Sequence, residues 1–266
     1  MIIDADVHIA PAPTGGNSIY IEELIDKMDY AGVHKAVTWL QPPYLRDIRS
    51  SNEYVYKATL KYPDRILGFG WADPNLGGEH ALDMVKKSLF EYGFYGVKLN
   101  GAQNEFYIDD PKVFPVIEEV AKAGKILAFH VGGDSPEHTH PFRLAKIAKA
   151  FPETPILMVH MGGAHFHDFG NAAIEFAEQC PNITIIGSVI RSHPLLKAIK
   201  ALGAERVCFG SDTPFEYMHV EVAKYMALLD GAVKLEEKSL IMGGNIERLF
   251  GLQTEKKHTG KNKITV

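Results

Sequence analysis

The chain has 266 residues, close to the roughly 250 residues that are usual for one α/β barrel. Hydrophobic residues make up 46% of it and charged residues 23%, so the chain can bury a large core. Its net charge of -5 argues against a nucleic acid or an anionic membrane as partner, because both attract basic surfaces.

Eight short apolar runs, rich in β-branched residues, recur along the chain. Continuous apolar runs of this length are typical of strands buried on both faces, as in a parallel sheet. We therefore predict strands at residues 2–8, 36–40, 66–71, 96–99, 126–130, 156–160, 183–188 and 207–210.

Amphipathic stretches between these runs predict helices. In the first stretch, Leu24 and Met28 share an apolar face, and Gly32 stands just past the end, where a glycine commonly terminates a helix. Another helix begins at Asp110-Pro111, an N-cap followed by a proline in the first turn. The predicted helices are 20–31, 79–92, 111–123, 141–151, 171–180, 193–202, 218–230 and 235–250, the last broken at Gly243-Gly244.

The alternation of eight strands with helices predicts an α/β fold, a (β/α)8 barrel. An open doubly wound sheet would also alternate, but eight nearly even repeats favour closure into a barrel. No change of composition divides the chain. We expect one catalytic domain over residues 1–253 and a polar, lysine-rich tail over residues 254–266.

Ligand-type side chains stand at the carboxyl ends of these strands, where barrels of this kind carry their active sites. Side chains alternate along a strand, so Asp6 and His8 point the same way. His130, His160 and Asp212 end three later strands. Imidazole and carboxylate groups that converge on one pocket are ligands for Zn²⁺ or a similar divalent ion. The pattern predicts a metal site on this rim.

Each of these residues also has a purely structural interpretation. A lone histidine at a strand end is more often hydrogen-bonded than metal-bound, and Asp212, before Thr213-Pro214, could cap a helix. Five such residues at four strand ends favour the metal site over these alternatives.

Motifs spread over nearly the whole chain carry a family resemblance. They are IDADVH at 3–8, GVKL at 96–99, HVG at 130–132, HMGG at 160–163, FGSD at 209–212 and GNIERLFG at 244–251. In these motifs the chain resembles the amidohydrolase superfamily, in particular its amidohydrolase-related (amidohydrolase 2) branch of barrel hydrolases and decarboxylases.

The resemblance implies a role for each rim residue. Asp6 and His8 would be the metal ligands of the first strand, and His130 that of the fifth. Asp212 would bind the metal and exchange a proton with its bound water. His160 would be a further ligand or a catalytic group that faces the substrate. The cofactor would be one divalent ion, in the first place Zn²⁺, with Mn²⁺ as the alternative.

One departure from the family pattern concerns the first ligand. Most members open with His-x-His, whereas this chain has Asp6 in the first position, as in a subset that includes some aromatic-acid decarboxylases. A carboxylate makes the site more anionic, so it holds the metal more tightly but weakens its Lewis acidity. This departure makes simple amide hydrolysis a less favoured prediction.

Three further residues are candidates for substrate binding: Lys98, Asn100 and Arg191. Lys98 could pair with a substrate carboxylate or be a buried, hydrogen-bonded lysine, and in two-metal members a carboxylated lysine at this place bridges the metals. We favour the first two interpretations. Asn100 follows the fourth strand, and Arg191 lies just beyond the seventh, where an exposed arginine is the alternative.

We expect a metal-dependent hydrolase that activates bound water to cleave an amide, lactone or related bond in a small, carboxylate-bearing molecule. The alternatives are a metal-dependent decarboxylase of an aromatic or unsaturated carboxylic acid, and a barrel that binds a ligand without catalysis. Neither a secretory signal nor a run of roughly 20 apolar residues is evident, and two cysteines suit a reducing compartment, so we expect a cytoplasmic protein, with a homo-oligomer left open.

Overall fold

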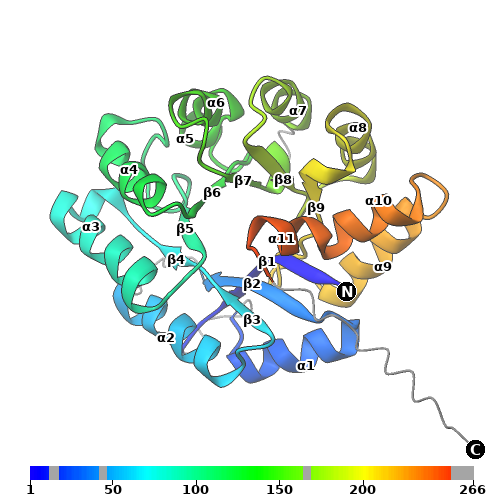
Figure 1. The fold of residues 1–266 in the computed structure, drawn as a ribbon, viewed down its shortest axis with the longest axis horizontal. Helices are drawn as coiled ribbons and strands as arrows, with labels where there is room; N and C mark the ends of the chain where they lie inside the picture. The colour runs from blue at the N-terminus through cyan, green and yellow to red at the C-terminus, as the bar shows by residue number, and fades with distance from the viewer. Residues whose placement is uncertain (12–17, 42–46, 164–168, 253–266) are drawn as a thin grey trace, which may run out of the picture.

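Parallel strands form a central barrel, and helices surround it (Figure 1). The computed structural model describes residues 1–11, 18–41, 47–163 and 169–252. Strands and helices alternate along these residues, and the predicted (β/α)8 fold is confirmed. The predicted tail, residues 254–266, lies outside the described residues.

The barrel strands follow one another in chain order, and the strands that pair do so in parallel. The predicted third strand is divided at Phe69 into two short pieces, although the backbone N–H of Phe69 still donates to the carbonyl of Thr38 at 2.9 Å. The strands are β1 (Ile3–Ile9), β2 (Lys35–Leu40), β3 (Ile66–Gly68), β4 (Gly70–Trp71), β5 (Gly96–Leu99), β6 (Ile126–His130), β7 (Ile156–Val159), β8 (Ile183–Ile186) and β9 (Val207–Cys208).

Backbone hydrogen bonds close the barrel between β1 and the segment that follows β9. The N–H of Ala5 donates to Phe209 at 3.0 Å, the N–H of His8 to Thr213 at 2.7 Å, and the N–H of Asp212 to Asp6 at 2.8 Å. Three of the predicted metal ligands, Asp6, His8 and Asp212, therefore lie at the seam of the barrel.

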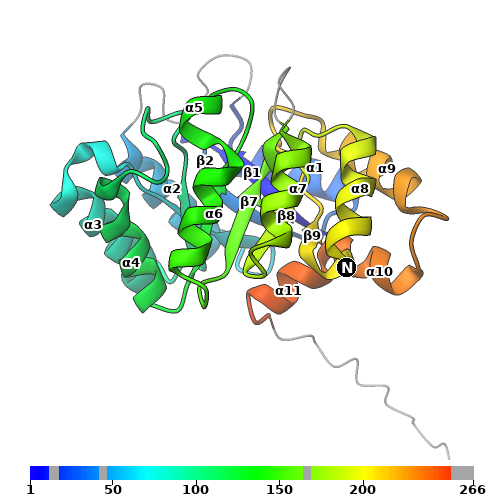
Figure 2. The ribbon, with the colours of Figure 1, turned by 90° about the horizontal axis from the view of Figure 1, so that it is seen from above.

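The helices form a ring around the strands, and α11 lies across one end of the barrel (Figures 1 and 2). Ile246 of α11 and Phe250, which follows the helix, pack against the apolar interior of the barrel and close it. The α-helices are α1 (Ile21–Ala31), α2 (Ile48–Lys61), α3 (Gly78–Lys86), α4 (Phe114–Lys122), α5 (Pro136–Thr139), α6 (Pro141–Ala150), α7 (Gly170–Glu178), α8 (Ser192–Leu202), α9 (Met218–Leu229), α10 (Leu235–Ser239) and α11 (Asn245–Leu249).

Short 3-10 and π-helical turns complete the secondary structure. The π-helical turn η6 breaks the last predicted helix at the expected place, Gly243-Gly244. The turns are η1 (Pro74–Leu76), η2 (Lys87–Glu91), η3 (Pro111–Val113), η4 (His160–Gly162), η5 (Ala204–Arg206) and η6 (Leu240–Gly244).

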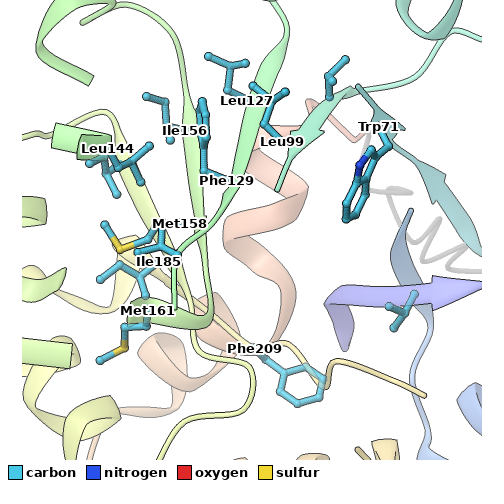
Figure 3. Close-up of a cluster of buried hydrophobic side chains, with 14 of the residues drawn as sticks. Trp71, Leu99, Leu127, Phe129, Leu144, Ile156, Met158, Met161, Ile185 and Phe209 are labelled. Carbon is cyan, nitrogen blue, oxygen red and sulfur yellow. The ribbon is translucent and has the colours of Figure 1, made fainter. Parts of the chain in front are cut away.

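Apolar side chains between the strands and the helices form the larger of two hydrophobic clusters (Figure 3). Side chains such as Leu127 and Phe129 of β6 and Ile185 of β8 point outward and meet those of the helices, among them Leu144 of α6. The smaller cluster fills the barrel interior. No helix among the described residues is long and apolar enough to cross a membrane.

One helix is missing from the predictions, and the predicted strands 156–160, 183–188 and 207–210 end earlier in the structure. α2 is absent from the predicted helices because its buried face includes polar residues, Ser51 and Asn52, as well as Val55 and Ala58. The predicted strand 156–160 ends one residue early, since His160 begins the turn η4.

Candidate metal centre

A cavity of about 550 Å³ lies where the strands of the barrel end. Buried polar groups form its floor, while Val189 and Phe215 contribute apolar wall. The lining residues are His8, Lys98, Asn100, Ala102, Gln103, Glu105, His130, Asp134, His160, Val189, Asp212, Phe215 and Glu216.

A register shift in β1 turns two predicted ligands toward the barrel interior. The pairing of β1 with β2 shifts between Asp4 and Val7. Before the shift, Ala5 packs in the barrel interior, whereas after it Val7 packs in the outer cluster. Asp6 and His8 consequently both face the interior. β-bulges often re-aim side chains beside active sites in this way.

Four of the predicted rim residues converge at the floor of the cavity. Asp6, His160 and Asp212 each offer a ligand atom, and these atoms lie within 4.8 Å of one another. Nε2 of His8 lies 3.5 Å from Oδ1 of Asp6 and 3.3 Å from Oδ1 of Asp212. This grouping of imidazole nitrogens and carboxylate oxygens matches the donor set of a divalent ion.

Hydrogen bonding fixes which nitrogen of His8 faces the cluster. Nδ1 lies 2.7 Å from the carbonyl oxygen of Leu40, which can only accept, so Nδ1 must donate. The lone pair of the neutral ring is then on Nε2, which also accepts from the indole of Trp39 at 3.1 Å. Burial and Lys98 would lower the pKa of His8, but the carboxylates of Asp212 and Asp6 raise it above its ordinary value.

The buried carboxylate of Asp6 indicates whether these residues fit a metal ion. Its side chain is fully buried, and Oδ1 has no hydrogen-bond partner among the described residues. Burial alone would raise the pKa of Asp6, but Lys98 and His160 lower it below its ordinary value. Nζ of Lys98 lies 3.6 Å from Oδ1, an ion pair without a hydrogen bond, so this buried oxygen keeps lone pairs that a divalent cation would satisfy. The residues therefore fit a divalent metal ion.

His160 is held in an unusual backbone conformation at this site. Its φ angle is 67°, and those of Asp212 and Val189 are 59° and 55°, all in the left-handed region. Non-glycine residues rarely adopt this region, and such strain clusters at functional sites. Burial lowers the pKa of His160 to about 4, so its ring is neutral at neutral pH.

His130 lines the same cavity but has a different partner. Its Nε2 lies 2.9 Å from both carboxylate oxygens of Asp134, and its ring centroid is 4.7 Å from that of His160. Burial would raise the pKa of Asp134, but His130 lowers it below its ordinary value. Asp134 was not predicted as a site residue, although the sequence carries a signal for it, an acidic residue four positions after a strand-end histidine.

The three candidate substrate-binding residues lie in different places. Lys98 is fully buried, its Nζ lies 3.8 Å from the ring centroid of Trp39, and it has no hydrogen-bond partner among the described residues. Burial lowers its pKa. Asn100 lines the cavity and accepts from the N–H of Gln103 at 3.0 Å. Arg191 is exposed at the start of α8 and is not among the cavity-lining residues.

Comparison with known proteins decides the family. A family model described as Amidohydrolase matches residues 3–252. The chain belongs to the amidohydrolase family. The resemblance seen in its motifs is thereby confirmed.

Curated relatives are similar over most of their length. The 2-amino-3-carboxymuconate-6-semialdehyde decarboxylase of Dictyostelium discoideum is 22% identical over 82% of this chain and 70% of its own. The γ-resorcylate decarboxylase of Rhizobium sp. is 25% identical over 71% of this chain and 75% of its own.

A solved structure shares the fold. It is the 5-carboxyvanillate decarboxylase of Novosphingobium aromaticivorans with manganese and a nitrobenzoic acid, with a TM-score of 0.76, 18% identity, and coverage of 95% of this chain and 96% of that one. The amidohydrolase chain described here is an enzyme of the hydrolase or carboxy-lyase kind, and its site suits a divalent metal.

Proposed function

We propose that this chain is a metal-dependent, non-oxidative decarboxylase of a small aromatic or unsaturated carboxylic acid. The observation that carries the proposal is the buried carboxylate of Asp6 in the first ligand position, beside Asp212. Two carboxylates reduce the Lewis acidity that amide or lactone hydrolysis needs. The two curated relatives named above are decarboxylases, which supports this function over the hydrolysis expected from the sequence.

The chain's own residues would hold the metal and move a proton, and Asp212 would do both. Asp6, His8 and Asp212 would hold the metal, with His130 and His160 as the candidates for further ligands. When bound, the ion would coordinate oxygen atoms of the substrate and so orient it.

Lys98 and the apolar wall would place the substrate. Nζ of Lys98 lies in the cavity, 3.6 Å from Oδ1 of Asp6 and without a hydrogen bond, so a substrate carboxylate or phenolate would supply the hydrogen-bond acceptor. Val189 and Phe215 provide apolar surface for a planar ring, and Asn100 offers an amide at the cavity wall.

Decarboxylation breaks the bond between the ring or chain carbon and the carboxylate carbon. The electron pair stays on the substrate carbon, CO2 leaves, and that carbon takes up one proton. Asp212 lies at the cavity floor, where its carboxylate can take a proton from water or from a hydroxyl group of the substrate and deliver it to the carbon. His160 lies next to it and can hydrogen-bond the substrate during the transfer.

CO2 release tests the proposal. Protein loaded with Zn²⁺ or with Mn²⁺ would be incubated with γ-resorcylate, other hydroxybenzoates and 5-carboxyvanillate, and in parallel with aryl amides and lactones. We expect metal-dependent release of CO2 from at least one carboxylic acid. Hydrolysis of an amide or lactone without CO2 release would overturn the decarboxylase assignment.

Metal analysis tests the site separately. We expect one divalent ion per chain after reconstitution and a higher melting temperature in its presence, because a ligand that binds only the folded state stabilises it. If neither Zn²⁺ nor Mn²⁺ binds or changes the melting temperature, the metal site itself is wrong.

A further inference from the structure

Ser188 contacts two residues of the candidate metal centre, yet the proposed chemistry gives it no role. It follows β8 by two residues and is fully buried. Its Oγ donates to Oδ2 of Asp6 at 2.5 Å and lies 2.9 Å from Nδ1 of His160. One hydroxyl thus joins a residue of β1 to a residue of the turn after β7.

The directions of these two hydrogen bonds follow from the groups involved. An ionised carboxylate can only accept, so the single hydroxyl hydrogen of Ser188 points to Asp6. The oxygen of Ser188 can then only accept from His160, which places a hydrogen on Nδ1. The neutral ring of His160 consequently carries its lone pair on Nε2.

The backbone around Ser188 keeps the hydroxyl in place. Gly187 accepts the hydroxyl hydrogen of Tyr225 at 2.6 Å, and Val189 has a φ of 55°, which is rare for a β-branched residue. Opposite, a Cβ on Gly210 would lie 3.1 Å from that of Asp6 and 3.3 Å from that of Ser188. Because residue 210 is glycine, the side chains of Ser188 and Asp6 have the space to contact each other.

We propose that Ser188 is a positioning residue that fixes the tautomer of His160, so that the Nε2 lone pair is available for the metal or for a substrate proton. The hydroxyl also passes part of the negative charge of Asp6 to the ring. Hydrogen-bonded partners of this kind orient ligating histidines and raise their basicity. The inference rests on the proposed function for its catalytic consequence, but not for the tautomer.

The tautomer can be measured in metal-free protein labelled with ¹⁵N-histidine at pH 7.5, by two-bond ¹H–¹⁵N correlation. The His160 signals are identified by their loss in His160→Gln. We expect a hydrogen on Nδ1 in the wild type and in Ser188→Thr, which keeps the hydroxyl, and a loss of this preference in Ser188→Ala. Ser88→Ala, a buried serine in η2 away from the cavity, is the matched control and should leave the tautomer unchanged.

Metal binding and kinetics give the second readout. Loss of a hydrogen-bonded partner of a ligand typically costs about 10–100-fold in metal affinity or activity. We expect Ser188→Ala to lower the affinity for Zn²⁺ by this factor, and to lower kcat more than it raises KM. Ser188→Thr should recover the Zn²⁺ affinity and kcat. An unchanged tautomer and unchanged Zn²⁺ affinity in Ser188→Ala would overturn the proposal. Absence of decarboxylation in the wild type would overturn only the proposed function, because the tautomer and the affinity do not depend on it.

Discussion

Nε2 of His130 lies 2.9 Å from each carboxylate oxygen of Asp134. Since a carboxylate only accepts, this nitrogen carries a hydrogen, and the lone pair of the neutral ring is on Nδ1. If His130 ligates the metal, it does so with Nδ1, while Asp134 holds the ring through the hydrogen bond from Nε2. A carboxylate behind a ligating histidine is a common arrangement in metal sites.

Asp134→Ala should therefore lower the affinity for Zn²⁺ by about 10–100-fold. Competition with a chromophoric chelator measures this, and Asp134→Asn, which keeps an acceptor, should lose less. A rise in affinity would contradict the expectation, because it would mean that Asp134 competes with the metal for His130.

Asp212→Asn should retain the metal but lose turnover by about 10²–10⁴-fold, the usual contribution of a general acid or base. The amide keeps the shape of the side chain and a ligand oxygen, but it cannot deliver a proton. Steady-state kinetics and metal analysis on the same preparation separate the two effects. Asp230→Asn, with a side chain 85% exposed, is the control. Wild-type turnover in Asp212→Asn would remove Asp212 from the proton transfer.

Asn52→Ala should destabilise the protein by about 1–3 kcal/mol for each buried group left without a partner. The amide of Asn52 donates to the carbonyl of Trp71 at 2.9 Å and accepts from its N–H at 3.0 Å, so it ties α2 to β4. Urea unfolding measures the loss. The exposed Asn171→Ala should stay within about 0.5 kcal/mol of the wild type. Equal stability of the two variants would show that α2 does not depend on this pair.

Gly96→Ala should cost about 1–3 kcal/mol through overpacking. An added Cβ would collide with the carbonyl oxygen of Ile126 and lie 2.6 Å from the ring of Phe69. Gly78→Ala is the matched control, since a Cβ there meets nothing within 4 Å. Thermal unfolding of both variants tests this, and a Gly96→Ala protein as stable as Gly78→Ala would mean that β5 and β6 can separate without cost.

The fold was readable from the sequence because the strands are buried on both faces and leave continuous apolar runs. α2 was not, since Ser51 and Asn52 occupy its buried face in place of aliphatic residues. A hydrogen bond to a backbone group of a neighbouring strand satisfies Asn52, and no local pattern reveals such a partner.

The floor of the site was also predictable in part. Asp6, His8, His160 and Asp212 were expected on one rim, and they lie together in the structure. Ser188 was not assigned, because its role depends on side-chain contacts between strands far apart in the chain. The hydrogen bond from Ser188 to Asp6 spans 182 positions, a relation that spacing alone does not encode.

The seam that closes the barrel also sets the order in which the site can form. The backbone of Asp212 bonds that of Asp6, and the N–H of Ser211 donates to the carboxylate of Asp4, 207 positions earlier in the chain. During synthesis from the N-terminus, Asp6 and His8 are translated early. They can contact Asp212 only after nearly the whole barrel has been translated. If Asp6, His8 and Asp212 hold the metal as proposed, a truncated chain would lack a competent metal centre, and binding of the metal would report that the barrel has closed.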